Sequence, residues 1–251
     1  MSYPLFPDKA FPPGRNEACF CQSGERFKHC CGAQTAERLP PFGVGILENF
    51  LTPEQCSAIC TLAADTPGKL FMARDSMQNL VPDKNRVTEW INFQEQDQQI
   101  MDQLVARAFA EQVIPRTGQN IEWYEEPQLL RYTPGGYYRY HSDAYYLVPE
   151  SAAWRKVVDR DISILLYLNN DYEGGELEFK RFSYTLKPRA GMLVWFPSDV
   201  RYEHMAKPVI SGERYVLVSW AAASSLPRVQ TERAKRSIDW LTREKKAAPE
   251  S

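Results

Sequence analysis

The hydrophobic pattern of the chain changes from helical to strand spacing near its middle. Residues 98–113 place apolar side chains at the spacing of an amphipathic helix. These positions are Ile100, Leu104, Val105, Phe109 and Val113. From Trp123 onward, short apolar runs follow one another between Gly, Pro and Asn turns, which predicts the strands of a sandwich or barrel. We therefore expect a mainly β protein with α-helices, a distorted jelly roll whose helices back one sheet.

The residues before position 98 contain patterns that predict two strands and a helix. Residues 44–47 form a short apolar run that predicts a strand. A helix is expected over 53–64, because Thr52 is a good N-cap and Pro53 suits the first turn. Gln55 stands where a capping box requires it. Residues 86–93 alternate between apolar and polar side chains and predict another strand.

Length and charge narrow the functional classes. At 251 residues, the chain can bury one sizeable core without being divided. The net charge of −2 argues against a broad nucleic-acid footprint. We expect no membrane contact, because no apolar run approaches spanning length. The first residues lack the basic and apolar regions of a signal peptide, so a cytoplasmic location is expected.

Two of the three histidines stand where a mononuclear iron site needs them. His141 and Asp143 are two residues apart, so on a strand both would point to the same face. His204, far downstream, would complete a facial triad of two histidines and one carboxylate, which is typical of non-haem Fe(II) oxygenases. The alternative is that His141-Ser142-Asp143 is a chance tripeptide on a polar strand, since short motifs often match by accident.

Arg214 follows His204 by ten residues. A guanidinium can hold a carboxylate through two charge-assisted hydrogen bonds. The alternative is an ordinary surface charge on a strand. Because Arg214 follows the Ser211-Gly212 turn and precedes an apolar run, we expect it to point inward.

The order of these motifs resembles the prolyl 4-hydroxylase branch of the Fe(II)/2-oxoglutarate dioxygenases. The resemblance covers roughly residues 42–222, and the ordered combination is far more specific than any single motif. The segments that carry it are Arg131-Tyr-Thr-Pro-Gly-Gly-Tyr-Tyr-Arg-Tyr-His-Ser-Asp143, Ile162-Ser-Ile-Leu-Leu-Tyr-Leu-Asn169, Gly174-Gly-Glu-Leu-Glu-Phe179, Gly191-Met-Leu-Val-Trp-Phe-Pro197 and Gly212-Glu-Arg-Tyr215.

This resemblance implies a fold and a set of roles. The fold would be a double-stranded β-helix, in which strands from opposite sheets bring the three metal ligands to the mouth of the barrel. His141, Asp143 and His204 would bind Fe(II), and Arg214 would hold the distal carboxylate of 2-oxoglutarate. The reaction would consume O2 and release succinate and CO2, and ascorbate is a further candidate cofactor.

The resemblance also implies roles for two tyrosines and a class of substrate. The Tyr132 hydroxyl would help to hold 2-oxoglutarate, and Tyr138 would line the pocket near the iron; the alternative is that both are ordinary strand aromatics. The substrate would be a prolyl residue of a protein. Two alternatives stay open: the same chemistry on a small molecule or another side chain, and a non-catalytic binding module. The loop from Tyr145 to Asp161 matches no specific member, which leaves the substrate undefined.

Four cysteines near the N-terminus predict a zinc site. They could instead form disulfides, but no export signal supports that reading, whereas four thiolates in a short loop can wrap a tetrahedral Zn(II). Residues 19–32 resemble the SEC-C motif, which implies that the ligands are Cys19, Cys21, Cys30 and Cys31. Because the protein would supply all four ligands, the zinc would be structural. The knuckle could dock a partner protein or only stabilise the chain.

The remaining cysteines and the ends of the chain complete the domain organisation. Cys56 and Cys60 lie one turn apart on the expected helix and are read as small hydrophobic residues, the alternative being a redox pair. We expect a Pro-rich segment over 1–15, the zinc knuckle over 16–34, and the dioxygenase domain over 42–228. Residues 229–251 would be a charged tail, with a helix over about 229–245.

Overall fold

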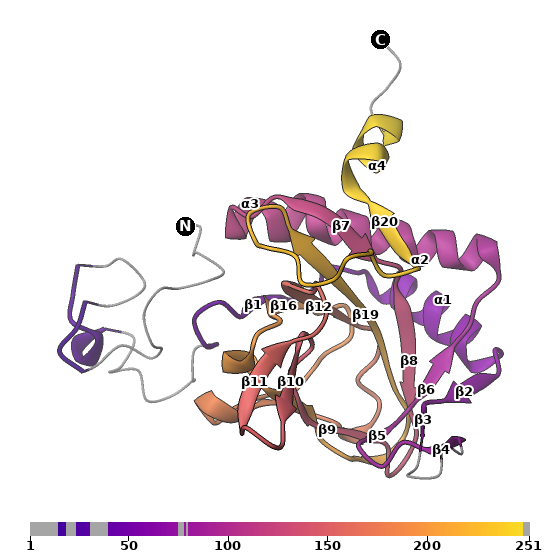
Figure 1. Ribbon diagram of the computed structural model, residues 1–251. Helices are drawn as coiled ribbons and strands as arrows, with labels where there is room; N and C mark the ends of the chain where they lie inside the picture. The colour runs from indigo at the N-terminus through magenta and orange to yellow at the C-terminus, as the bar shows by residue number, and fades with distance from the viewer. Residues whose placement is uncertain (1–14, 19–23, 31–39, 75–77, 79, 248–251) are drawn as a thin grey trace.

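Two β-sheets face each other, and helices cover the outer side of the larger one (Figure 1). The computed structural model describes residues 15–18, 24–30, 40–74, 78 and 80–247. Within them, the larger sheet has nine strands in the order β1-β16-β12-β19-β8-β6-β2, and β7 and β20 extend it beside β19. The smaller sheet has the order β15-β14-β17-β9-β5.

The strands and helices have the following bounds. The larger sheet contains β1 (Gly45–Leu47), β2 (Gly68–Leu70), β6 (Glu89–Ile91), β7 (Ile121–Glu125), β8 (Gln128–Tyr132), β12 (Ile162–Tyr167), β16 (Leu193–Pro197), β19 (Arg214–Ala223) and β20 (Ser237–Asp239). The smaller sheet contains β5 (Arg86–Val87), β9 (Tyr137–His141), β14 (Leu177–Phe179), β15 (Tyr184–Leu186) and β17 (His204–Ala206). Three further pairs are β3 (Met72–Arg74) with β4 (Leu80–Pro82), β10 (Tyr145–Val148) with β11 (Ala153–Lys156), and β13 (Glu173–Gly174) with β18 (Val209–Ser211). The helices are α1 (Pro53–Ala64), α2 (Glu95–Ala108), α3 (Ile114–Thr117) and α4 (Trp240–Ala247), with the π-helix η3 (Phe109–Val113) and the 3-10 helices η1 (Phe27–His29), η4 (Lys180–Phe182) and η5 (Val200–Tyr202).

The larger sheet is buried on both faces, which explains its nearly continuous apolar runs. Along β19, Tyr215 and Leu217 pack with the core formed by α1 and α2, whereas Val216 and Val218 pack with the core between the two sheets. This alternation follows from the two-residue period of a strand. Arg214 lies two residues before Val216 and therefore faces the space between the sheets. The jelly-roll expectation is confirmed.

Three predictions about elements can be checked directly. The capping box is present: Gln55 N–H donates to Thr52 Oγ1 at 3.3 Å, and Thr52 N–H donates to Gln55 Oε1 at 3.0 Å. The helix expected over 98–113 is longer, since α2 begins at Glu95 and continues through η3. The strand expected over 86–93 is divided at Thr88, because β5 pairs with β9 in the smaller sheet and β6 pairs with β8 in the larger one.

The prediction of a helix over 229–245 is wrong for its first half, because α4 begins only at Trp240. Tertiary contacts hold the preceding segment in irregular structure. The backbone N–H groups of Val229 and Gln230 donate to the buried carboxylate of Asp159, at 2.7 and 3.1 Å. Residues 237–239 then form β20 on β7. Charge and apolar spacing alone could not reveal these distant partners.

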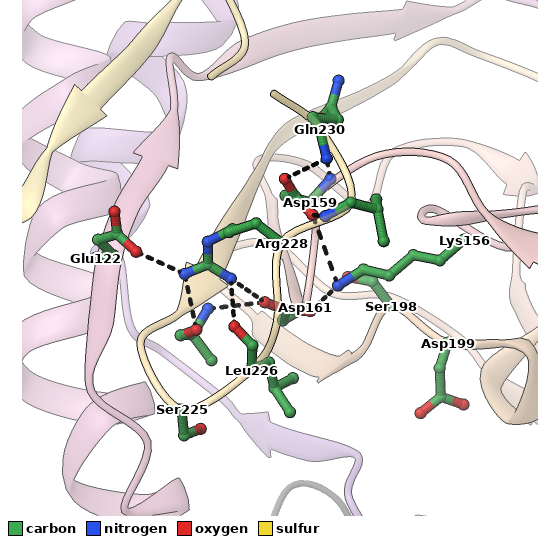
Figure 2. Close-up of polar contacts among 12 residues, drawn as sticks. Glu122, Lys156, Asp159, Asp161, Ser198, Asp199, Ser225, Leu226, Arg228 and Gln230 are labelled. Carbon is green, nitrogen blue, oxygen red and sulfur yellow. Dashed lines mark hydrogen bonds and ion pairs between the residues drawn. The ribbon is translucent and has the colours of Figure 1, made fainter. Parts of the chain in front are cut away.

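A second buried carboxylate, Asp161, joins this C-terminal segment to the base of the β10–β11 hairpin (Figure 2). Lys156 Nζ, at the end of β11, donates to Asp161 Oδ1 at 2.7 Å. Arg228 Nη1 contacts Asp161 Oδ2 at 3.3 Å, and Ala223 N–H donates to the same oxygen at 2.9 Å. These contacts fix the base of the hairpin to the C-terminal segment.

The N-terminal segment is described only in part. Ala18 and Arg26 form an isolated β-bridge, and Phe27 to His29 form η1. Cys30 follows this turn, whereas Cys19, Cys21 and Cys31 lie outside the described residues. The zinc geometry predicted from these four cysteines therefore stays a prediction. No helix in the described part of the chain combines the length and apolarity needed to cross a bilayer.

Candidate active site

The structure brings His141, Asp143 and His204 together. Each offers one potential ligand atom, and these atoms all lie within 4.8 Å of one another. His141 Nε2 is 3.6 Å from Asp143 Oδ1, and His204 Nε2 is 3.8 Å from Asp143 Oδ2. The expectation that the ligands come from opposite sheets is wrong: His141 on β9 and His204 on β17 are cross-strand partners within the smaller sheet. Adjacent strands place such partners close enough to share one ion.

Backbone carbonyls orient both imidazole rings. His141 Nδ1 lies 2.7 Å from the carbonyl oxygen of Arg139, and His204 Nδ1 lies 3.0 Å from that of Tyr202. A carbonyl oxygen can only accept, so each Nδ1 carries the proton and each Nε2 keeps its lone pair. This is the usual arrangement around metal-binding histidines. Both Nε2 atoms face Asp143.

Burial keeps His204 neutral. Desolvation and the neighbouring His141 lower the pKa of His204 to about 4, although Asp143 opposes this shift. A neutral imidazole at pH 7 can bind a metal without first losing a proton.

Asp143 lies just beyond the end of β9, so serines rather than the strand fix its carboxylate. Ser163 Oγ on β12 donates to Asp143 Oδ2 at 2.6 Å and contacts Ser198 Oγ at 2.7 Å. Burial favours the protonated form of this carboxyl, but the neighbouring His204 and His141 rings and the hydrogen bond from Ser163 hold its pKa well below the usual range. Asp143 is therefore an anion at neutral pH.

Arg214 lies on the wall of the same cavity as this cluster. Only 2% of its surface is exposed, and Nη1 donates to the carbonyl oxygen of Gly175 at 2.6 Å. Its Nε is buried without a hydrogen-bond partner. Its guanidinium carbon lies 3.9 Å from the centre of the Tyr132 ring, its register partner on β8. A buried guanidinium with an unused donor fits an anionic ligand.

Sequence reasoning missed three polar side chains on this cavity wall. Ser163 and Tyr167 are inward positions of β12, and the Tyr167 hydroxyl is buried without a partner near Arg214. Arg86 enters the wall from β5. The sequence held a signal for the first two, because Ser163 and Tyr167 are four residues apart and therefore lie on the same face of an otherwise aliphatic strand.

Tyr138 lies directly against the cluster, as its position three residues before His141 suggested. The rings of Tyr138 and His141 stack with their centres 3.5 Å apart. Burial, which is the largest cause, raises the pKa of Tyr138 to about 12. Its hydroxyl therefore remains protonated at neutral pH.

The donor set fits a divalent iron ion better than a structural zinc ion. Two imidazoles and one carboxylate form a three-ligand site, which leaves further coordination positions for a substrate or cosubstrate. Structural zinc sites instead close all four positions with protein ligands, most of them thiolates. In the same cavity, the guanidinium of Arg214 could bind a carboxylate. The cavity could therefore hold a metal and an acidic cosubstrate together.

Comparisons with known families agree with this geometry. The family model described as the 2OG-Fe(II) oxygenase superfamily matches residues 127–222, which include the three clustered residues and Arg214. This match, together with the prolyl 4-hydroxylases among the relatives of the chain, supports a 2OG-Fe(II) oxygenase that is similar to prolyl 4-hydroxylases. A second model, the SEC-C motif, matches residues 15–33. The oxygenase thus carries an N-terminal SEC-C motif, as its cysteine spacing indicated.

Individual relatives show how far the similarity extends. The oxygenase is 26% identical over 199 residues to prolyl 4-hydroxylase 13 of Arabidopsis thaliana, covering 69% of each chain. It is 32% identical over 112 residues to prolyl 3-hydroxylase 2 of Gallus gallus, covering 39% of this chain but only 16% of that relative. Its fold matches the collagen prolyl hydroxylase of Paramecium Bursaria Chlorella virus-1 with a TM-score of 0.54, at 22% identity, covering 71% of this chain and 96% of that one.

Proposed function

We propose that this oxygenase hydroxylates prolyl residues of a polypeptide. The substrate, 2-oxoglutarate and O2 would be converted into the hydroxylated product, succinate and CO2. Fe(II) bound by His141, Asp143 and His204 would supply the activation of O2 and the decarboxylation of 2-oxoglutarate. Arg214 and Tyr132 would hold the distal carboxylate of the cosubstrate. Ascorbate would keep the iron ferrous between turnovers.

The observation that carries this proposal is the presence of two complementary sites in one cavity. The three clustered residues and Arg214 line the same hollow between the sheets. A buried guanidinium without an acidic partner is costly unless an anion binds to it. A dicarboxylate that spans from the metal to Arg214 would satisfy both sites. The apolar wall, including Leu130, Val216 and Val218, would keep the reacting centre dry.

The relatives support a prolyl substrate. Both curated relatives carry names of prolyl hydroxylases, and the structural neighbour is titled a collagen prolyl hydroxylase. A protein substrate also fits the exposed apolar side chains of the β10–β11 hairpin, Tyr146 and Trp154, which are 57% and 39% exposed. Exposed aromatic side chains of this kind are enriched where proteins bind one another.

We further propose that the SEC-C motif holds a structural zinc ion through Cys19, Cys21, Cys30 and Cys31. Thiolate ligands of this kind persist in a reducing compartment, such as the cytoplasm. The knuckle would then dock the substrate protein or a larger assembly beside the oxygenase domain. A chain segment this short depends on its metal for folding.

Asp143→Ala tests the catalytic proposal. The wild-type protein with Fe(II) and 2-oxoglutarate should release succinate and add 16 Da to proline-containing peptides. Asp143→Ala should lose both activities, because the site loses its only anionic ligand. Binding of Mn(II), measured by electron paramagnetic resonance, should weaken in parallel.

Glu232→Ala is the matched control, because Glu232 is an exposed carboxylate outside the cavity. It should leave succinate formation and Mn(II) binding unchanged. Full turnover of 2-oxoglutarate by Asp143→Ala would refute the metal assignment. Turnover by wild type without hydroxylation of any prolyl peptide would refute the substrate assignment alone.

A further inference from the structure

Arg86 places a second guanidinium on the wall of the active-site cavity. Its guanidinium carbon lies 3.6 Å from the centre of the Phe71 ring and 4.7 Å from that of the Tyr138 ring. Its Nε is buried and has no hydrogen-bond partner. Two aromatic rings therefore fix the position of this cation, while its hydrogen-bonding capacity remains unused.

The strand register places Arg86 beside the cluster of His141, Asp143 and His204. Arg86 on β5 pairs with Tyr138 on β9, and Tyr138 pairs with Ala206 on β17. All three side chains line the cavity. Tyr138 in turn stacks on His141 at 3.5 Å. Only one aromatic ring thus separates the Arg86 guanidinium from a proposed iron ligand.

Arg131 and Arg160, which are half-buried like Arg86, both have acidic partners. Arg131 Nη2 lies 2.6 Å from Glu89, and Arg160 Nη2 lies 2.6 Å from Glu125. The side chain of Arg86 makes neither a hydrogen bond nor an ion pair with any of the residues that the structure describes. Its Nε atom is buried, and a buried polar atom is rarely left without a hydrogen-bond partner. The missing partner of Arg86 is therefore expected to come from a ligand.

A count of charges in the cavity indicates the sign of that ligand. The formal charges of Fe(II), Asp143, 2-oxoglutarate and Arg214 cancel. The positive charge of Arg86 is then left without compensation in a largely apolar cavity. An anion is favoured over a neutral carbonyl oxygen, because Coulomb attraction is strong where water is scarce. A carboxylate would also match the planar guanidinium with two hydrogen bonds.

We propose that Arg86 is a specificity residue that binds a carboxylate of the substrate next to the target prolyl residue. This carboxylate is either the side chain of a neighbouring acidic residue or the C-terminal carboxylate of the polypeptide. The inference rests on the proposed prolyl hydroxylase function and adds to it a preference for acidic sequences. Arg214 serves the cosubstrate, and Arg86 serves the substrate.

Peptide binding to protein loaded with Mn(II) and 2-oxoglutarate tests this proposal without turnover. The probes are fluorescent proline peptides in matched pairs: Glu or Gln beside the proline, and a C-terminal proline as free acid or amide. Wild type should bind at least one acidic member about tenfold more tightly than its neutral partner, which is the range of a hydrogen-bonded charged contact. The pair that shows the preference identifies the source of the carboxylate.

Arg86→Gln should remove this preference, and Arg86→Lys should retain part of it. Both variants should keep wild-type 2-oxoglutarate binding and a cooperative thermal unfolding transition, which shows that they fold. Arg189→Gln is the matched control, because Arg189 is 67% exposed on the side chain and lies outside the cavity. It should leave all affinities unchanged.

Three results would overturn the inference. Wild type that hydroxylates prolyl peptides but binds acidic and neutral members equally would refute the role of Arg86 and retain the proposed function. An unchanged acidic preference in Arg86→Gln would place the contact elsewhere. Loss of 2-oxoglutarate affinity in Arg86→Gln would assign Arg86 to the cosubstrate. Absence of prolyl hydroxylation by wild type would refute the proposed function itself.

Discussion

Asp161 should be among the most costly single charges to remove from this fold. Only 4% of its surface is exposed, and its carboxylate binds Lys156, Arg228 and the backbone N–H of Ala223 (Figure 2). Asp161→Asn keeps the shape of the side chain but removes its charge. Two cations would then share a neutral amide, and Lys156 would keep only Asp159, at 3.9 Å.

The size of the effect follows from burial. Removing one partner of a buried ion pair costs about 3–5 kcal/mol. The side chains of Lys156 and Arg228 are 14% and 25% exposed, so water relieves part of this cost. Arg228 also keeps Glu122 at 2.9 Å. We therefore expect Asp161→Asn to lower the free energy of unfolding by about 2–3 kcal/mol. For a chain of this size, Tm would fall by about 4–12 °C.

Thermal and urea unfolding, followed by circular dichroism, would measure this change. Glu48→Gln is the control, because Glu48 pairs with Arg189 at 3.5 Å while both side chains are more than half exposed. Such surface pairs contribute little, so its Tm should stay close to that of wild type. Equal Tm values for Asp161→Asn and Glu48→Gln would refute the reasoning that this network stabilises the fold.

Three further outcomes are expected. Arg214→Ala should raise the 2-oxoglutarate requirement at least tenfold in a succinate assay while Mn(II) binding stays near wild type, because it removes a buried charged contact; an unchanged requirement would place the cosubstrate elsewhere. Cys60, whose pKa burial, Cys56 and Asp171 raise to about 12, and Cys56, whose pKa burial also raises, should resist iodoacetamide at pH 8 in the native protein; rapid alkylation of either, located by peptide mass spectrometry, would contradict this. Cys30→Ser combined with Cys31→Ser should abolish zinc in metal analysis yet preserve peptide-free 2-oxoglutarate turnover, because the oxygenase domain has its own core; wild-type protein without zinc would refute the knuckle.

Local rules predicted the elements that depend on local contacts. The capped helix α1 appears where Thr52, Pro53 and Gln55 place it, because a capping box satisfies the first backbone donors within four residues. The inward direction of Arg214 was also predictable, since the turn before it and the apolar strand after it fix its face. The candidate metal ligands could be recognised in the sequence because few residue types bind Fe(II).

The sequence could not predict features that depend on distant partners. Val87 and Glu89 belong to different sheets, although residues 86–93 read as one strand. The segment before Trp240 is irregular because Asp159, some 70 residues earlier, binds its backbone. The same limit applies to Arg86, whose guanidinium is positioned by Phe71 and Tyr138 rather than by its own neighbours in sequence.

The contacts around Asp143 show that a candidate metal ligand can be recognised from the sequence, whereas the position of its carboxylate depends on the fold. Asp143 lies outside the β9 ladder, so the same-face rule for His141 and Asp143 cannot by itself fix the carboxylate. The carbonyl oxygen of Ser198 instead accepts bonds from Ser142 Oγ at 2.8 Å and Ala144 N–H at 3.2 Å, on either side of Asp143. The N–H of Ser198 donates to the carbonyl oxygen of Asp161 at 3.0 Å. The backbone of Ser198 therefore holds both the segment around Asp143 and the base of the β10–β11 hairpin. A site that must hold ligand geometry closely requires such contacts around its ligands.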